Sequence, residues 1–350
     1  MIMTEQNGKI FHIFANFSRI LFAAVIIGGL VWFRREQLQQ CFAAFDYRYV
    51  LPALSCYILQ TAIGSWRWRK LAVVQNFAIS NFEAFSLTMQ GNFFSLIIPG
   101  GAIGGDVVKM GLLAKRRQSG CRAEGIFTIF MDRVTGMIAL FILTIVLLLL
   151  FFPRIPDMQI PGFDISAAQI KFAAWGLLLL CSAGIGAGIA IFFHRILRKI
   201  PLANWMLNTI DRRFNNAASR MTAMADLYAK YPGTVAYLTV ISIFFLHLLS
   251  TFPLCFLLAG AGVPLSGTML LLIPTAVTIG NIAGLIPLTP GGIGLRDLTI
   301  IAILSSGGIS AGTSEAAQLM STGLSVIFNL CGGLFFAFDH RRTNPTGLQK

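Results

Sequence analysis

Two interrupted apolar segments decide the fold of this 350-residue chain. The first reads Gly91-Asn92-Phe93-Phe94-Ser95-Leu96-Ile97-Ile98-Pro99-Gly100-Gly101-Ala102-Ile103-Gly104-Gly105-Asp106. The second reads Gly280-Asn281-Ile282-Ala283-Gly284-Leu285-Ile286-Pro287-Leu288-Thr289-Pro290-Gly291-Gly292-Ile293-Gly294-Leu295-Arg296-Asp297. Both contain Gly-Asn, then Pro-Gly-Gly, then an aspartate seven residues after that proline, although the Asn-to-Pro spacing is seven residues in the first and nine in the second. Because proline and glycine interrupt helices, we predict two helices joined at a break in each segment.

These two stretches are called the first and second broken segments. The residues predicted to form their breaks are Pro99, Gly100, Gly101, Gly104 and Gly105 in the first, and Pro290, Gly291, Gly292 and Gly294 in the second.

The composition around the broken segments is that of a membrane protein. Hydrophobic residues make up 56% of the chain, charged residues only 12%, and the mean hydropathy is +0.74. Soluble proteins carry about 25% charged residues, so a soluble enzyme, a secreted disulfide scaffold and a disordered chain are excluded. The six cysteines are scattered, and no catalytic, nucleotide-binding or metal-binding motif is present. We therefore predict no catalytic residues, no metal site and no cofactor.

The apolar runs predict an all-α polytopic membrane protein with about six full transmembrane helices and two oppositely oriented re-entrant hairpins. The broken segments, within residues 82–113 and 268–305, supply the hairpins. The six full spans are expected at residues 17–33, 49–66, 125–152, 170–193, 234–261 and 316–338.

Charge sets the expected orientation. The net charge of +13 favours nucleic acid as a partner only in a soluble protein, so we expect none here. With both termini cytoplasmic, 20 Lys and Arg residues lie inside and six outside, which follows the positive-inside rule. The count would be the same if each broken segment crossed the membrane twice. The predicted layout is a cytoplasmic N-terminus (1–16), one transmembrane domain (17–340) and a cytoplasmic tail (341–350), with an amphipathic cytoplasmic connector at 194–231.

The matching broken segments indicate an internal repeat, with residues 17–152 repeated as 170–338. Three crossings separate the two breaks, so they enter from opposite faces, as in inverted-topology transporters whose substrate site lies between the repeats. Chance matching of Gly and Pro in membrane helices is the alternative. The shared Asn92/Asn281 and Asp106/Asp297 positions argue against it.

The broken segments also carry candidate substrate-binding residues. Irregular backbone inside a membrane requires protein or water around it, and a helix that starts there points its N–H groups toward an anion. Lys109 and Arg296 add positive charge near the breaks. Asp106 and Asp297 fit equally as helix N-caps or as functional groups. Asn92 and Asn281 are expected either to bridge helices or to line the cavity.

Asp132-Arg133 lies about 15 Å into a long apolar helix, where charges are costly and usually functional. Successive helical residues point about 100° apart, so we expect Asp132 to meet Lys109 and Arg133 to meet Asp106 or a lipid phosphate. The alternative places the pair at the headgroups. For His247 we expect a hydrogen bond between helices, with a proton relay as the alternative. The basic aromatic cluster at 66–70 is expected to mark the membrane interface.

These motifs, in this order, resemble the lysylphosphatidylglycerol synthase membrane-domain family, also called flippase-like domain proteins. The resemblance covers residues 15–340 and rests on Asn92, Pro99, Gly104-Gly105-Asp106-Val107-Val108-Lys109, Asp132-Arg133 and the stretch from Pro290 to Asp297. The family often has Arg at Lys109, Glu at Asp132 and Glu at Asp297, so the ligand geometry can differ. The resemblance implies the half that moves lipid between leaflets, without the soluble aminoacyltransferase domain.

The resemblance and the motifs together predict a lipid flippase of the bacterial inner membrane. Its expected partners are membrane lipids with anionic headgroups and a separate lipid-synthesis enzyme; the cargo is an anionic or modified phospholipid, or an isoprenoid or hopanoid lipid. The alternatives are a membrane enzyme or subunit of a phosphatidylglycerol lysyltransferase-like system, and a non-catalytic partner of another membrane protein that docks through the connector.

Overall fold

The computed structural model of the chain describes residues 43–98, 102–116, 122–157, 166–192, 201, 205, 209, 217–286 and 294–343. All regular secondary structure within these ranges is helical, which confirms the all-α fold. Among the described residues, four helical stretches are long and apolar enough to cross a membrane: Arg122–Ile155, Ala167–Ile191, Pro232–Gly260 and Ala311–Phe338. The chain is therefore a multi-pass membrane protein. The expected span at 17–33 and both Pro-Gly-Gly breaks lie outside the described residues.

The first broken segment folds as a helical hairpin. Its helices are α4 (Asn81–Ile97) and α5 (Ala102–Arg116), which pack along each other in opposite directions. The Ser80 hydroxyl caps α4 by accepting a hydrogen bond from the Glu83 N–H at 3.1 Å. The helices before and after the hairpin are α3 (Val50–Val74) and α6 (Arg122–Phe151), and both pack against it.

Gly104 and Gly105 are helical residues rather than part of the break, which corrects the prediction for these two positions. Both lie in α5, which begins at Ala102. A Cβ atom on Gly105 would collide with the carbonyl oxygen of Gly91 in α4. The glycine is thus needed for the close approach of two helix backbones, and not for a change of chain direction.

The second broken segment folds in the same way. Its helices are α13 (Met269–Ala283) and α14 (Leu295–Ser306). A Cβ on Gly280 would meet the Arg296 carbonyl oxygen at 3.1 Å and the Ile300 side chain. When Asp106 is aligned with Asp297, Arg296 corresponds to Gly105 and Ile300 corresponds to Lys109. Gly105 and Lys109 are the residues that a Cβ on Gly91 would meet in the first hairpin. The two hairpins therefore share one packing geometry, as the internal repeat predicts.

The remaining helices complete the second half of the chain. They are α7 (Ala167–Phe192), α10 (Ala217–Ala229), α11 (Pro232–Ser242), α12 (Phe252–Gly260), α15 (Ala311–Leu330) and α16 (Gly332–Thr343). A π-helical turn, Ile243–Leu248, and a 3-10 turn, Leu249–Thr251, join α11 to α12. Two further 3-10 turns within the described residues are η1 (Tyr47–Tyr49) and η3 (Phe152–Asp157).

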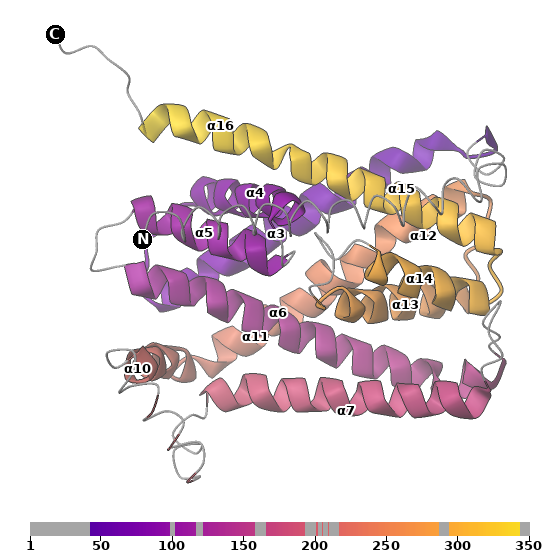
Figure 1. Ribbon diagram of the computed structural model, residues 1–350, viewed down its shortest axis with the longest axis horizontal. Helices are drawn as coiled ribbons and strands as arrows, with labels where there is room; N and C mark the ends of the chain where they lie inside the picture. The colour runs from indigo at the N-terminus through magenta and orange to yellow at the C-terminus, as the bar shows by residue number, and fades with distance from the viewer. Residues whose placement is uncertain are drawn as a thin grey trace, which may run out of the picture.

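The two hairpins occupy opposite halves of the molecule (Figure 1). Helix α6 runs the length of the bundle, with α4 and α5 near its N-terminal half and α13 and α14 near its C-terminal half (Figure 1). Separate buried clusters support each half: Trp68, Leu87 and Leu113 in the first, and Leu257, Ile273 and Leu304 in the second. This is the opposed arrangement that the sequence predicts, although the number of full crossings stays a prediction.

Helix α3 continues through the basic aromatic cluster that was expected at the membrane interface. Arg67 and Trp68 are buried in the protein, so these two residues do not face lipid headgroups. Their polar atoms are satisfied by neighbouring helices, as described below. The α10 part of the predicted connector packs on the same region, since the Tyr228 hydroxyl donates to the Leu71 carbonyl at 3.0 Å.

Candidate functional site

A cavity of about 460 Å³ lies between the two hairpins. It is lined by α3, both hairpins, α6, the π-helical turn and α15. Seven of the eight residues predicted from the sequence to bind substrate line it: Asn92, Asp106, Lys109, Asp132, Arg133, Asn281 and Arg296. The eighth, Asp297, does not line the cavity, but it forms an ion pair with Arg296, which does. The structure thus brings the candidates from both repeats together, while their role in binding stays a prediction.

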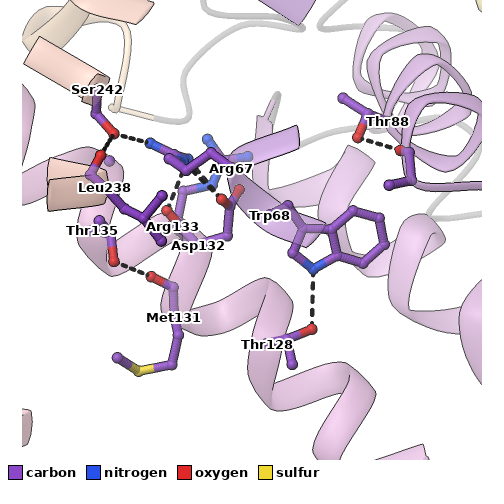
Figure 2. A network of polar contacts seen from close by, with 12 residues as sticks. Arg67, Trp68, Thr88, Thr128, Met131, Asp132, Arg133, Thr135, Leu238 and Ser242 are labelled. Carbon is purple, nitrogen blue, oxygen red and sulfur yellow. Dashed lines mark hydrogen bonds and ion pairs between the residues drawn. The ribbon is translucent and has the colours of Figure 1, made fainter. Parts of the chain in front are cut away.

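Asp132 pairs with Arg67 of α3 and not with Lys109, which corrects the expected pairing. Figure 2 shows the Arg67 guanidinium held between α6 and Ser242: Nε donates to the Asp132 carboxylate at 2.9 Å, and a terminal nitrogen donates to the Ser242 hydroxyl at 2.8 Å. A second terminal nitrogen donates to the Asp132 carbonyl at 3.0 Å. Gly136 makes room for this arrangement, since a Cβ there would lie 3.2 Å from the guanidinium.

Arg133 pairs with Asp106, as the sequence predicted. Its Nε donates to the Asp106 Oδ2 at 2.7 Å, and one terminal nitrogen lies 2.6 Å from the same oxygen. The pair joins α6 to the first hairpin. Helix α6 begins at Arg122, so Asp132 and Arg133 lie about 15 Å along it. The neighbouring residues point to different partners, as a 100° rotation per residue requires.

Lys109 differs from the three arginines around the cavity. Its ammonium group lies 3.6 Å from the centre of the Trp68 ring and donates to the Thr88 hydroxyl at 3.2 Å. The Trp68 indole N–H in turn donates to Thr128 at 3.0 Å, which fixes the ring (Figure 2). Throughout the described ranges, no carboxylate lies within ion-pair distance of Lys109. The residue is 5% exposed, so this cation is both buried and without an opposite charge in contact.

Arg296 belongs to a polar cluster of the second repeat. Its Nε lies 3.0 Å from Asp297 Oδ1, and a terminal nitrogen donates to the Thr322 hydroxyl at 3.1 Å. Gln318 of α15 donates to Asp297 at 2.9 Å. Asp297 also accepts the Gly294 N–H at 3.4 Å, so it supports the start of α14, where Gly294 has a φ of 106°. Asp297 thus supports the helix start from the third position of α14, and the N-cap itself is Gly294; the functional role of Asp297 stays a prediction.

His247 makes the hydrogen bond between helices that the sequence favoured. Its Nε2 lies 2.9 Å from the Gly136 carbonyl oxygen of α6. The residue stands in the π-helical turn, where Gln60 of α3 donates to the Leu246 carbonyl at 2.8 Å. Such turns leave backbone groups without their usual helical partners, and they are frequent at functional sites. Both His247 and Gln60 line the cavity.

Several cavity residues were missed by the sequence analysis. On α3 they are Tyr57, Gln60, Thr61, Gly64 and Arg67; on α15 they are Gln318, Ser321 and Ser325. Each set recurs at intervals of three or four residues, which places it on one face of a helix. A polar stripe along an otherwise apolar span is the signal that would have found them.

The cavity wall is rich in cationic side chains, as a site for an anion requires. Four cationic side chains line it, and three of them are held by carboxylates. Hydroxyl, amide and apolar groups complete the wall. Among the residues described, no cluster of three or more His, Cys, Asp or Glu side chains is placed to hold a metal ion.

Comparison with known proteins agrees with these features. The chain is 24% identical over 290 residues to a UPF0104 membrane protein of Methanothermobacter thermautotrophicus, with 81% of this chain and 83% of the relative covered. No solved structure matches. Residues 20–333 match the family described as the lysylphosphatidylglycerol synthase TM region, which includes both hairpins and every residue around the cavity. The chain therefore belongs to the lysylphosphatidylglycerol synthase TM region family.

Proposed function

We propose that the protein is a flippase that moves a phospholipid, or a related polar lipid, between the two leaflets of its membrane. The observation that carries the proposal is the cavity between two oppositely oriented hairpins, with basic side chains from both repeats on its wall. Inverted repeats with interrupted helices are the architecture of transporters that open alternately to each side. The family description connects the chain to an aminoacylated phospholipid, which supports a lipid cargo.

The headgroup and the acyl chains have different needs in such a process. A headgroup requires polar partners throughout the crossing, because an unpaired charge in hydrocarbon is costly. The arginine and lysine side chains of the cavity supply these partners at membrane depth. The acyl chains need no protein partner, since they can remain in the bilayer.

A reconstitution experiment tests the proposal. Purified protein is placed in phosphatidylcholine vesicles that contain phosphatidylglycerol with a fluorescent acyl chain, and dithionite is added to bleach the outer leaflet. Protein-free vesicles should lose about half of the fluorescence, and vesicles with protein should lose more as inner-leaflet lipid appears outside. Lys109→Ala and Arg296→Ala should each slow this loss while the variants remain folded. Bleaching that stops at the protein-free level would contradict the proposal.

The family description also contains the word synthase, which favours one second candidate, a membrane enzyme or subunit that modifies lipid. In that case a new lipid species would form when the vesicles are supplied with aminoacyl-tRNA. Mass spectrometry of the extracted lipids separates this function from translocation, in which the labelled lipid keeps its mass.

The proposal includes a setting for the protein. We propose the plasma membrane of a bacterium, and the excess of Lys and Arg in the expected inner loops supports an orientation with both termini in the cytoplasm. A separate enzyme on the same membrane would supply the lipid. Protease protection of tags placed at each terminus, in cells and in inverted vesicles, tests this orientation.

A further inference from the structure

We propose that the cavity selects headgroups with one net negative charge, carried by a phosphodiester, and that Lys109 is the residue that selects them. The inference rests on the proposed lipid transport and names its substrate class. It distinguishes phosphatidylglycerol from lysylphosphatidylglycerol, the net cationic lipid in the family description.

The first step is the charge balance of the cavity wall. The Arg67, Arg133 and Arg296 guanidinium groups each lie within 3.0 Å of an aspartate carboxylate. In each of these three pairs, one positive charge is balanced by one negative charge. Among the described residues, Lys109 is the remaining cation on the wall, and it faces an aromatic ring and a hydroxyl group instead of a carboxylate. With His247 counted as neutral and Asp297 counted as the partner of Arg296, the described residues at the cavity carry four positive and three negative charges, a surplus of one positive charge.

The surplus positive charge has a free-energy cost in the empty cavity. A buried charge without an opposite charge is unfavourable in a medium of low dielectric constant, and a bound ligand of opposite sign relieves the cost. A monoanionic headgroup makes the filled cavity neutral. A zwitterionic headgroup leaves the surplus unchanged, and a headgroup with one net positive charge doubles it. The cavity therefore favours the monoanion.

The contacts that hold Lys109 leave part of its hydrogen-bonding capacity unused. An ammonium group has three N–H donors, of which Thr88 accepts one and the Trp68 ring attracts the charge without accepting a full hydrogen bond. Arg67 donates from all three of its nitrogens to carboxylate, hydroxyl and carbonyl oxygens. Arg133 and Arg296 each donate to a carboxylate. Lys109 thus keeps donor capacity for a phosphate oxygen, and its position over a fixed ring keeps the charge at the cavity wall until an anion arrives.

The experiment compares two properties, binding and movement. Binding is measured as the rise in unfolding temperature of detergent-solubilised protein on addition of phosphatidylglycerol, lysylphosphatidylglycerol or soluble glycerophosphoglycerol. Movement is measured by dithionite bleaching with labelled forms of the two lipids. Lys109→Gln removes the charge, and Lys109→Arg keeps it. The matched control is Lys115→Gln, since Lys115 lies on the same helix but is exposed and outside the cavity.

We expect phosphatidylglycerol to stabilise the wild-type protein more than lysylphosphatidylglycerol does, and to move about ten times faster, as the loss of one charge-assisted hydrogen bond implies. Lys109→Gln should remove both preferences, Lys109→Arg should keep them, and Lys115→Gln should behave as wild type. Equal or stronger stabilisation by lysylphosphatidylglycerol would overturn the inference, as would a folded Lys109→Gln variant that retains the preference.

Two outcomes separate the inference from the function on which it rests. Preferential binding of phosphatidylglycerol without any movement would contradict the flippase and leave the charge selection standing. Stabilisation by glycerophosphoglycerol equal to that by the lipid would identify a site for soluble phosphate esters and overturn the assignment to lipid.

Discussion

Removing the Asp132 carboxylate should destabilise the protein strongly, because it leaves a buried guanidinium without its counter-charge. The Arg67 side chain is 7% exposed, and both its ion pair and its hydrogen bond to the Asp132 backbone run to this one residue. Breaking a buried pair by removing one partner costs about 3–5 kcal/mol in soluble proteins. Water reaching the cavity will soften the cost, so we expect Asp132→Ala to lower the free energy of unfolding by about 3 kcal/mol.

The measurement is denaturant unfolding in mixed micelles, with the free energy taken from linear extrapolation. A double variant, Arg67→Met with Asp132→Leu, removes both charges and should recover most of the loss, because an apolar pair of similar volume costs little. Arg154→Ala is the control, since Arg154 is exposed in η3 and should change the free energy by less than about 0.5 kcal/mol. If Asp132→Ala were as mild as this control, the pair would not be buried in the folded protein.

Three further predictions concern two glycine contacts and the topology of the first hairpin. Gly105→Ala should destabilise the protein, because its Cβ would collide with the Gly91 carbonyl oxygen. Gly111→Ala on the same helix meets open space and should be neutral or stabilising by up to about 1 kcal/mol. Thermal unfolding of the two variants compares them. Gly136→Ala should displace the Arg67 guanidinium and lose its effect when Arg67 is already Met, a coupling that a double-mutant cycle measures. Lys115→Cys should react with a membrane-impermeant reagent from one side of the membrane. Ile97→Cys, which is exposed at the end of α4 and outside the cavity, should not react from the opposite side, and reaction there would show that the first hairpin is a full span.

The positions of the two hairpins could be predicted from the sequence because their signal is local. Proline cannot continue a helix, so Pro-Gly-Gly inside an apolar run places the break to within a few residues. The equal spacing to Asp106 and Asp297 then relates the two hairpins. Gly104 and Gly105 were assigned to the break because a sequence does not show which glycines turn the chain and which permit close packing. That distinction depends on Gly91, fourteen residues away, whose carbonyl oxygen is the atom in contact.

The candidate charges were also found from the sequence, but one of their partners was not. Asp106 and Arg133 are 27 residues apart and belong to segments already expected to adjoin, so their pairing was among the predictions. Arg67 was assigned to the membrane interface because it follows an apolar run and stands between two tryptophans. Its burial results from the continuation of α3 and from the contact of that helix with α6 and Ser242. These are tertiary contacts, which the local sequence does not show.

The two hairpins have the same backbone arrangement, but they carry their charged residues at different positions. This difference places the proposed selectivity on one side of the cavity. At the position of Lys109 in the first hairpin, the second hairpin has Ile300, and at the position of Arg296 the first has Gly105. Each hairpin thus contributes one cation, but from different sites on its second helix. The aspartates occupy equivalent positions, and both reach the helix that follows their hairpin, Asp106 to Arg133 and Asp297 to Gln318. Arg296 pairs with a carboxylate of its own repeat, and Lys109 pairs with none among the described residues. If the protein transports lipid as proposed, we therefore expect the headgroup to bind most strongly in the first repeat.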